Sequence, residues 1–271
     1  MVRQVGGYRL ERVVGEGATG VVYAARGDAG VVAVKMLRPE YAGEDVVRAR
    51  FVREARLAAG IKTPHVVPIL ELGEVDDLTY LVMPFLSGGS LADRLRAMGQ
   101  LSVGETVALA AQLGRGLDAL HEARILHRDV KPSNVLLDGD GSAALSDFGL
   151  ARGAESTRLT SEGQLLGSLH YIAPELIEGA AATAASDVYA LGCLLYECLV
   201  GAPPFAGRSP AEIGFAHLAE PPPDPRQARA GVQDEIAAAL AAALEKDPAA
   251  RPTTGTALAR MLHVARNAQP L

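Results

Sequence analysis

The sequence predicts an α+β protein in which a strand-rich N-terminal part is followed by a mainly helical C-terminal part. Two observations predict this division. Up to residue 83, short apolar runs alternate with glycine-rich or polar turns, which is typical of an antiparallel sheet. From residue 90 onward, apolar residues recur every three or four positions, which is the period of amphipathic helices. We therefore expect a first lobe over residues 1–83, a hinge over 84–89 and a second lobe over 90–271.

Composition places the chain among folded globular proteins. Of its 271 residues, 49% are hydrophobic and 21% are charged. The net charge of -6 argues against non-specific binding of nucleic acid. Cys193 and Cys198 lie in one apolar segment, which indicates buried thiols in a reducing compartment. The start lacks the apolar run of a signal peptide, and the apolar stretch 188–200 is too short to span a bilayer. We expect a soluble, cytoplasmic chain without a membrane segment.

A glycine-rich hairpin follows the first predicted strand. Residues 8–14 and 21–25 have strand character, and Gly15-Glu16-Gly17-Ala18-Thr19-Gly20 lies between them. Glycines at these spacings let backbone N–H groups close over phosphates with no side chain in the way. A dinucleotide-binding fingerprint would require a helix after the glycines, whereas a return strand follows here. The segment on its own also fits a plain glycine-rich hairpin.

A lysine and a glutamate downstream of the hairpin form a candidate ion pair. Lys35 ends the apolar strand 31–35. Residues 39–60 contain a helix whose apolar stripe consists of Val47, Phe51, Ala55 and Ala58. Glu54 lies beside that stripe, from where its carboxylate can reach Lys35 and hold it toward the α and β phosphates of a nucleotide. Taken singly, Lys35 also fits a solvated strand end, and Glu54 also fits an exposed helix position.

Two more strands and a break complete the N-terminal part. Residues 66–72 and 78–83 are predicted strands joined by a polar turn, which brings the predicted antiparallel sheet to five strands. A proline and two glycines then interrupt the pattern in the hinge. Because Pro84 has no N–H, only its carbonyl and the backbone of Leu86 are available there to meet an adenine edge.

Helix signals dominate the C-terminal part. Ser90 and Ser102 are each followed three positions later by an acidic residue, which is the pattern of a capping box. A buried helix ends at Gly201, and its apolar residues are Val188, Leu191, Leu195 and Leu199. Asp187, at the start of that helix, is interpreted as its N-cap.

The stretch from His127 to Asn134 carries the chemistry. Asp129 can orient a hydroxyl nucleophile and accept its proton, and Lys131 can neutralise a moving phosphoryl group. Asn134 and Asp147 have side-chain oxygens that can hold magnesium. A short hairpin between these two residues is expected to return Asp147 beside Asn134. Each role requires a different residue type, and this set of types at these spacings matches a known template for phosphoryl transfer.

A polar segment follows Asp147 and ends at Ala173-Pro174-Glu175. Its hydroxyl residues are Ser156, Thr157, Thr160, Ser161 and Ser168. A phosphorylated hydroxyl in this segment could pair with Arg128 and order the loop, because phosphate adds charge and several hydrogen-bond acceptors. The alternative is a surface loop whose hydroxyls are never modified.

With these motifs the chain resembles a eukaryotic-type protein kinase catalytic domain over residues 8–266, and within that family the bacterial, actinobacterial Ser/Thr kinases of the PknB type. The closer likeness lies in Ser186-Asp187-Val188-Tyr189-Ala190-Leu191-Gly192-Cys193 and Gly201-Ala202-Pro203-Pro204-Phe205. The resemblance implies a two-lobed protein kinase fold with ATP and Mg²⁺ in the cleft, a pair between Glu175 and Arg251, and a Ser/Thr-type loop at Lys131. Together, the motifs and the resemblance place ATP against Val14, Gly15, Glu16, Gly17, Ala18, Thr19, Gly20, Val22, Ala33, Lys35, Pro84, Leu86 and Leu136.

The resemblance also implies protein substrates and autophosphorylation. Thr160 matches an activating phosphothreonine of these kinases, Glu162 stands at a second such position, and Ser168 stands where threonine is commoner. Relatives dimerise through the N-lobe, and many continue into a membrane helix and an extracellular sensor. A homodimer, and a role as the cytoplasmic domain of a membrane-anchored receptor kinase, are therefore both open.

Two alternative functions are weighed against an active protein kinase. One is a pseudokinase that uses the fold as a docking module, against which every catalytic residue type is present. The other is a small-molecule kinase of the aminoglycoside-phosphotransferase kind. The long loop ending in Ala173-Pro174-Glu175 and the Arg128 before Asp129 argue against that class.

Overall fold

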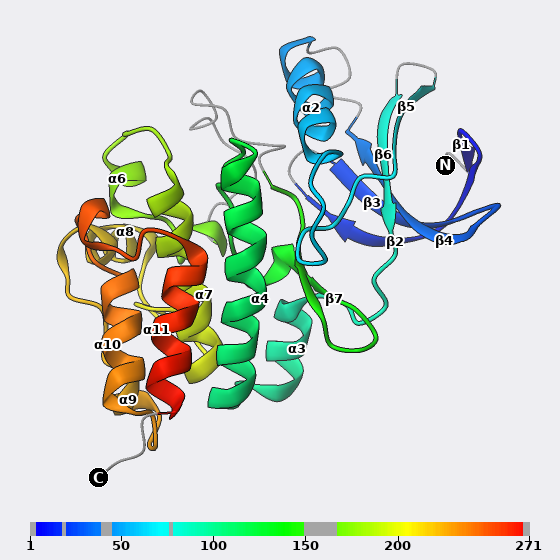
Figure 1. The fold of residues 1–271 in the computed structure, drawn as a ribbon. Helices are drawn as coiled ribbons and strands as arrows, with labels where there is room; N and C mark the ends of the chain where they lie inside the picture. The colour runs from blue at the N-terminus through cyan, green and yellow to red at the C-terminus, as the bar shows by residue number, and fades with distance from the viewer. Residues whose placement is uncertain (1–3, 18–19, 39–44, 76–77, 149–166, 268–271) are drawn as a thin grey trace.

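The structure is a computed structural model that describes residues 4–17, 20–38, 45–75, 78–148 and 167–267 (Figure 1). A sheet with one helix beside it forms one part, and a group of helices forms the other. The sheet is antiparallel with strand order β1-β2-β3-β4-β6-β5. Its elements are β1 (Gln4–Val5), β2 (Tyr8–Glu16), β3 (Gly20–Gly27), β4 (Gly30–Leu37), α2 (Asp45–Ala58), β5 (Glu71–Val75) and β6 (Leu78–Pro84).

The predicted strands are present, with two differences. The two-residue strand β1 adds a sixth strand at the edge next to β2. The fourth predicted strand, placed at 66–72, begins only at Glu71. The reason is tertiary, because the N–H of Val67 donates to the Leu145 carbonyl at 2.9 Å, in the other lobe. Pro68 has no N–H for a sheet ladder, so the chain joins the sheet only after it.

Helix α2 buries its predicted apolar stripe. Phe51, Ala55 and Ala58 are each 2% exposed or less, while the side chain of Val47 lies outside the described residues. Phe51 packs against Leu37 of β4 and Leu81 of β6. The 3.6-residue spacing in the sequence therefore identified the face that anchors this helix to the sheet.

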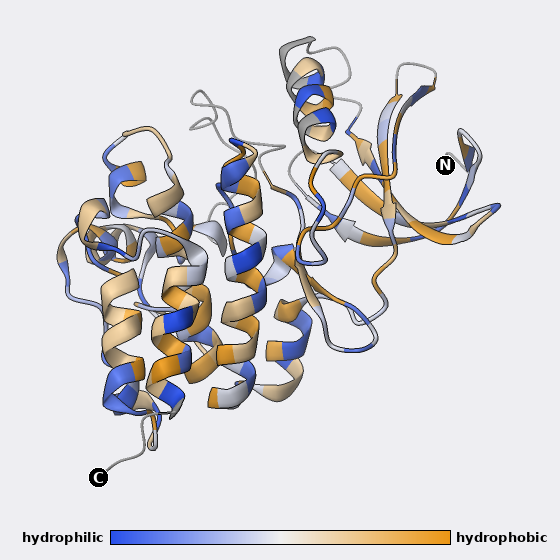
Figure 2. Cartoon of the chain, viewed as in Figure 1, coloured by the Kyte–Doolittle hydropathy of each residue, from blue (hydrophilic) through white to orange (hydrophobic). Residues whose placement is uncertain are grey.

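The helical lobe surrounds one large apolar core. The capping boxes predicted at Ser90 and Ser102 are both formed, and Gly201 ends its helix with a left-handed φ of 89°. Figure 2 shows hydrophobic residues concentrated on the central helices. The elements are α3 (Leu91–Met98), α4 (Val103–Glu122), η1 (Pro132–Asn134), β7 (Val135–Leu137), β8 (Ala143–Leu145), α6 (Pro174–Ile177), α7 (Ala184–Val200), α8 (Pro210–Ala219), α9 (Pro225–Ala228), α10 (Asp234–Ala243), η2 (Pro248–Ala250) and α11 (Gly255–Asn267).

Helix α4 packs against two other helices, α11 and α7. A Cβ on Gly114 would lie 2.6 Å from the Gly255 carbonyl, so glycine permits the close approach of α4 and α11. Helix α4 also packs against α7, in which both cysteines are buried and free, as expected. No helix in the described part of the chain is long and apolar enough to cross a membrane.

The segment after β6, which the sequence predicts to be a hinge, is joined to the hairpin of β7 and β8. The N–H of Gly88 donates to the Leu137 carbonyl at 3.0 Å, and the N–H of Leu137 donates to the Gly89 carbonyl at 2.8 Å. These bonds bring the chain that leaves the sheet against the strand that follows η1. The predicted hinge therefore lies beside the hairpin that connects Asn134 to Asp147.

Candidate active site

A short hairpin brings the two halves of the central motif together. Strands β7 and β8 pair so that Val135 faces Leu145. Beyond that pair, the N–H of Ser146 donates to the Asn134 carbonyl at 2.8 Å. Asp147 is the residue after Ser146, so this backbone bond places it close to Asn134. The prediction that the hairpin returns Asp147 beside Asn134 is confirmed.

The side chains of Lys131, Asn134 and Ser168 form one hydrogen-bonded network with Asp129. The Lys131 Nζ lies 2.8 Å from Oδ2 of Asp129, and the Asn134 amide nitrogen donates to the same oxygen at 2.9 Å. The Ser168 hydroxyl donates to Oδ1 of Asp129 at 3.0 Å and accepts from Lys131 Nζ at 2.8 Å. The carboxylate is thus oriented by three donors. The sequence analysis named Ser168 only among the loop hydroxyls and for standing where threonine is commoner, and its contact with Asp129, 39 residues away, had no local signal.

Lys35 is buried and contacts Asp147. Its side chain is 5% exposed, and Nζ lies 2.7 Å from Oδ1 of Asp147. Gly20 leaves room for it, since a Cβ there would lie 3.3 Å from Lys35 Cε and 2.6 Å from the Met36 carbonyl. The predicted partner Glu54 is on α2, but its side chain lies outside the described residues. The cation that sequence analysis assigned to the phosphates thus lies beside the predicted metal ligand.

Asp187 holds the backbone of the loop that contains Asp129. Its carboxylate is 3% exposed and accepts the N–H groups of His127 and Arg128, each at 2.8 Å, and lies 2.8 Å from His121 Nε2. Arg128 has a φ of 65°, an uncommon conformation for a side chain of its size. The interpretation of Asp187 as an N-cap was wrong, because Thr183 occupies that position. Its partners lie about sixty residues away, so helix signals alone did not reveal this role.

His127 is enclosed behind the loop. It is fully buried, and its ring meets Phe148 edge-on at 6.2 Å between centroids. Burial lowers the pKa of His127, although Asp187, Asp129 and Asp147 favour its charged form. The imidazole is therefore neutral at pH 7 and acts as a packed element of the core.

The residues predicted to contact the nucleotide lie on β2, β3, β4, β6 and β7 and in the segments beside these strands. Val22 pairs with Lys35 across β3 and β4, and Ala33 on β4 is 8% exposed. Leu136 lies on β7, where it forms a bridge to Ser90. The others are placed as follows: Val14, Gly15 and Glu16 at the end of β2, Gly17 in the turn, Gly20 at the start of β3, Pro84 at the end of β6 and Leu86 in the segment after it; Ala18 and Thr19 lie outside the described residues.

A family model described as a protein kinase domain matches residues 8–262 of this sequence. The chain belongs to the protein kinase domain family. The fold agrees, because the kinase domain of Mycobacterium tuberculosis PknI superposes with a TM-score of 0.77 at 29% identity, covering 99% of this chain and 100% of that chain. The predicted two-lobed kinase fold and the resemblance to bacterial kinases are thus confirmed.

Two mycobacterial kinases are among the curated relatives of this kinase domain. Serine/threonine-protein kinase PknE of Mycobacterium tuberculosis (strain ATCC 25618 / H37Rv) is 40% identical over 264 residues, which cover 97% of this chain and 46% of that protein. Serine/threonine-protein kinase PknD of the same strain is 40% identical over 263 residues, which cover 96% of this chain and 40% of that protein. The kinase domain therefore spans less than half the length of these relatives.

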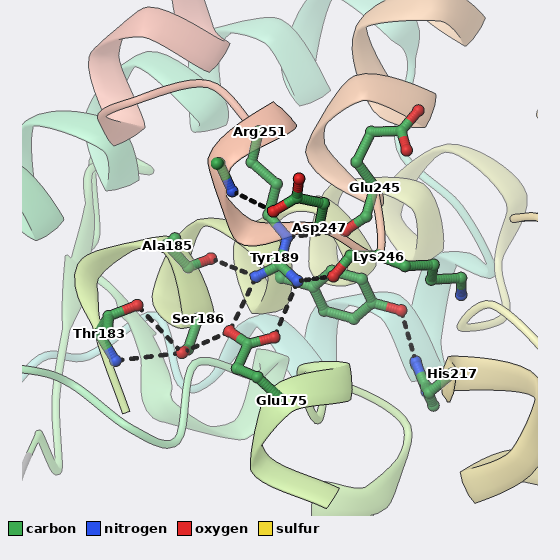
Figure 3. Close-up of polar contacts among 11 residues, drawn as sticks. Glu175, Thr183, Ala185, Ser186, Tyr189, His217, Glu245, Lys246, Asp247 and Arg251 are labelled. Atoms are coloured by element: carbon green, nitrogen blue, oxygen red, sulfur yellow. Dashed lines mark hydrogen bonds and ion pairs between the residues drawn. The ribbon is translucent and has the colours of Figure 1, made fainter. Parts of the chain in front are cut away.

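The kinase domain contains the expected ion pair at the end of the loop region (Figure 3). Arg251 donates to both carboxylate oxygens of Glu175, at 2.9 and 2.8 Å, and its side chain is 0% exposed. The Ser186 hydroxyl donates to the same carboxylate at 2.7 Å. Burial by itself would raise the pKa of Glu175, but the hydrogen bonds from Arg251 and Ser186 outweigh it and the pKa is lowered. The carboxylate is therefore charged at neutral pH.

Proposed function

We propose that this chain is the catalytic domain of a serine/threonine protein kinase, which transfers the γ-phosphoryl group of ATP to hydroxyls of proteins. The observation that carries the proposal is the network around Asp129. A carboxylate held by Lys131, Asn134 and Ser168 presents an acceptor of fixed orientation to an incoming hydroxyl. The mycobacterial relatives named as serine/threonine-protein kinases support the same activity.

In this proposal Asp129 orients the substrate hydroxyl and takes its proton. Lys131 lies 2.8 Å from that carboxylate and offsets the negative charge of the moving phosphoryl group. Lys35 meets the α and β phosphates, with Glu54 as a further partner as predicted from the sequence. The chain thus contributes mainly positioning and charge, as expected for phosphoryl transfer.

The side chains of Asn134 and Asp147 fit a magnesium ion. The amide nitrogen of Asn134 donates to Asp129. Among the contacts of the described residues, no donor occupies the side-chain carbonyl oxygen of Asn134, which is available as a metal ligand. The contact of Asp147 with Lys35 uses Oδ1, which leaves Oδ2 as a ligand. Mg²⁺ typically takes one or two carboxylate or amide oxygens and completes its shell with phosphates and water. When bound, the ion supplies positive charge that offsets the charge of the phosphates.

The nucleotide is proposed to lie between the lobes, with 1–83 above it, 90–271 below it and the hinge 84–89 at its edge. The glycine-rich hairpin would cover the phosphates. Val22, Ala33 and Leu136 would pack on the adenine, and the Pro84 carbonyl and the backbone of Leu86 would meet its polar edge. Supporting this placement, the hinge is hydrogen-bonded to the strand β7 that carries Leu136.

Regulation by autophosphorylation is proposed at Thr160. This residue and Glu162 lie outside the described residues, so the proposal rests on their position before Ser168 in the sequence. Following the resemblance, we also propose a homodimer through the N-lobe, which light scattering across a concentration series would test. An ATP-dependent enzyme with buried free cysteines suits the cytoplasm, where we place it.

Intact-protein mass spectrometry after incubation with Mg-ATP tests the activity. We expect phosphates on the wild type and on Asp140→Asn, an exposed aspartate in the β7–β8 turn, but none on Asp129→Asn. Fragment spectra would locate Thr160 among the modified residues. Equal gain by Asp129→Asn would contradict the proposed role of Asp129. Parallel assays with a generic protein substrate and an aminoglycoside separate protein kinase from small-molecule kinase activity.

A further inference from the structure

Arg38 makes a side-chain contact to the glycine-rich turn that the proposed function does not use. It directly follows β4, and its Nε donates to the Gly17 carbonyl at 3.1 Å. Its Nη2 lies 3.8 Å from Oε2 of Glu16, the last residue of β2. One guanidinium thus contacts two consecutive residues at the tip of the hairpin.

Gly17 is the described residue of the turn that lies outside strands β2 and β3, so no strand pairing fixes it. Glycines at 15, 17 and 20 give the backbone a wide choice of conformations, and that freedom must be removed to hold one arrangement. Within the turn, the N–H of Gly17 donates to the Gly20 carbonyl at 2.9 Å. With Arg38 on its carbonyl, both backbone polar groups of Gly17 are paired. Arg38 therefore fixes the tip from outside the hairpin.

The anchor of Arg38 is itself well held. The residue before it, Leu37, pairs with Gly20 across β3 and β4 and is 2% exposed. Lys35 lies on the same strand and pairs with Val22. A single strand thus carries both the lysine proposed to bind the phosphates and the arginine that contacts the turn above them. Because Lys35 lies on β4 and Arg38 directly follows it, this strand sets the distance between the turn and Lys35.

Resting on the proposed function, we infer that Arg38 is a positioning residue, which holds the glycine-rich turn at the height where its N–H groups meet the phosphates of ATP. Arginine suits this role because it is charged at any physiological pH and presents several donors in a rigid plane. The bond to the Gly17 carbonyl carries the effect. Glu16 contributes little, since its side chain is 63% exposed and its contact is long.

Arg38→Met tests the inference, with Arg26→Met as the matched control. Arg26 is also on the sheet and pairs with Glu11 at 2.9 Å, but near the opposite end of β3. For Arg38→Met we expect about a tenfold higher KM for Mg-ATP, equivalent to about 1.4 kcal/mol, with kcat within about twofold. ADP affinity should fall in parallel while adenosine affinity stays unchanged, because only phosphates meet the turn. Arg38→Lys should recover part of the loss, and Arg26→Met should resemble the wild type.

Thermal unfolding without nucleotide checks that each variant is folded, and Arg38→Lys carries the same prediction at smaller size if Arg38→Met is unstable. The inference is overturned if Arg38→Met matches Arg26→Met in affinity for ADP, or if adenosine affinity falls as much as ADP affinity. A wild type that binds no Mg-ATP would instead overturn the proposed function. The two failures are therefore distinguishable.

Discussion

Replacing Arg251 with methionine should cost a large part of the stability of this protein. All five N–H groups of the guanidinium are used: two on Glu175 and the others on the carbonyls of Ala185, Glu245 and Lys246 (Figure 3). The guanidinium also lies 4.8 Å from the centroid of the Tyr189 ring. Methionine fills the space but leaves a buried carboxylate without its cation, with the Ser186 hydroxyl and the backbone as remaining donors. Breaking a buried pair in this way costs about 3–5 kcal/mol.

Chemical denaturation followed by circular dichroism measures this cost, and the exposed pair of Arg208 and Glu220 supplies the control. That pair also has two contacts of 2.8 Å, but its side chains are 38% and 36% exposed. Arg208→Met should therefore cost less than about 1 kcal/mol. The double variant Glu175→Gln/Arg251→Met should be less destabilised than the sum of the single changes, because no unpaired charge remains. A loss for Arg251→Met no larger than for Arg208→Met would refute the reasoning.

The same pair predicts a pH dependence. Since the folded pKa of Glu175 lies below its ordinary value of 4.5, its contribution is present above that value and is lost as pH falls through the folded pKa. The difference in unfolding free energy between the wild type and Glu175→Gln should therefore shrink below about pH 4.5. A constant difference down to pH 3 would contradict this assignment.

Three further predictions concern Gly20, His217 and Asp187. Gly20→Ala should lower the melting temperature and weaken ATP binding, because its Cβ would lie 2.6 Å from the Met36 carbonyl; differential scanning fluorimetry with and without ATP measures both, and Gly7→Ala, with nothing within 4 Å, is the control. Burial, with Lys246 and His170 adding to it, lowers the pKa of His217 from 6.5 to about 4. As the pH falls, the unfolded chain therefore binds a proton before the folded chain does, and the unfolding free energy should fall from pH 6.5 to 4. His217→Phe should flatten that slope in urea titrations. Asp187→Asn should reduce kcat by about 10²-fold with KM for ATP little changed, because the loop carrying Asp129 loses an acceptor; steady-state kinetics decide, and a normal kcat would contradict the positioning role.

Local patterns in the sequence identified much of the fold. The capping boxes at Ser90 and Ser102 depend on residues three positions apart, and the stripe of Phe51, Ala55 and Ala58 depends on the helix period. Each of these signals involves neighbours within a turn or two of the chain. The strand at Glu71 was misplaced because Val67 bonds to Leu145, a partner that no local pattern reveals.

The candidate site divides in the same way. Residue types and spacings in the sequence single out Asp129, Lys131, Asn134, Asp147 and Lys35 as candidates, because each proposed chemical role requires a particular functional group. The sequence did not show which side chains these groups contact. Ser168 joins Lys131 and Asp129 from 37 and 39 residues away.

By itself, then, the sequence determined the family, the order of helices and strands and the groups available for chemistry, since these depend on residue type and short spacing. The tertiary structure alone decided that Asp187 holds the backbone of His127 and Arg128, that Lys35 contacts Asp147 and that Arg38 contacts the glycine-rich turn. Such contacts join segments distant in the chain, and their geometry depends on how buried faces pack together. Packing brings these charges within hydrogen-bonding distance, and residue order does not specify that distance.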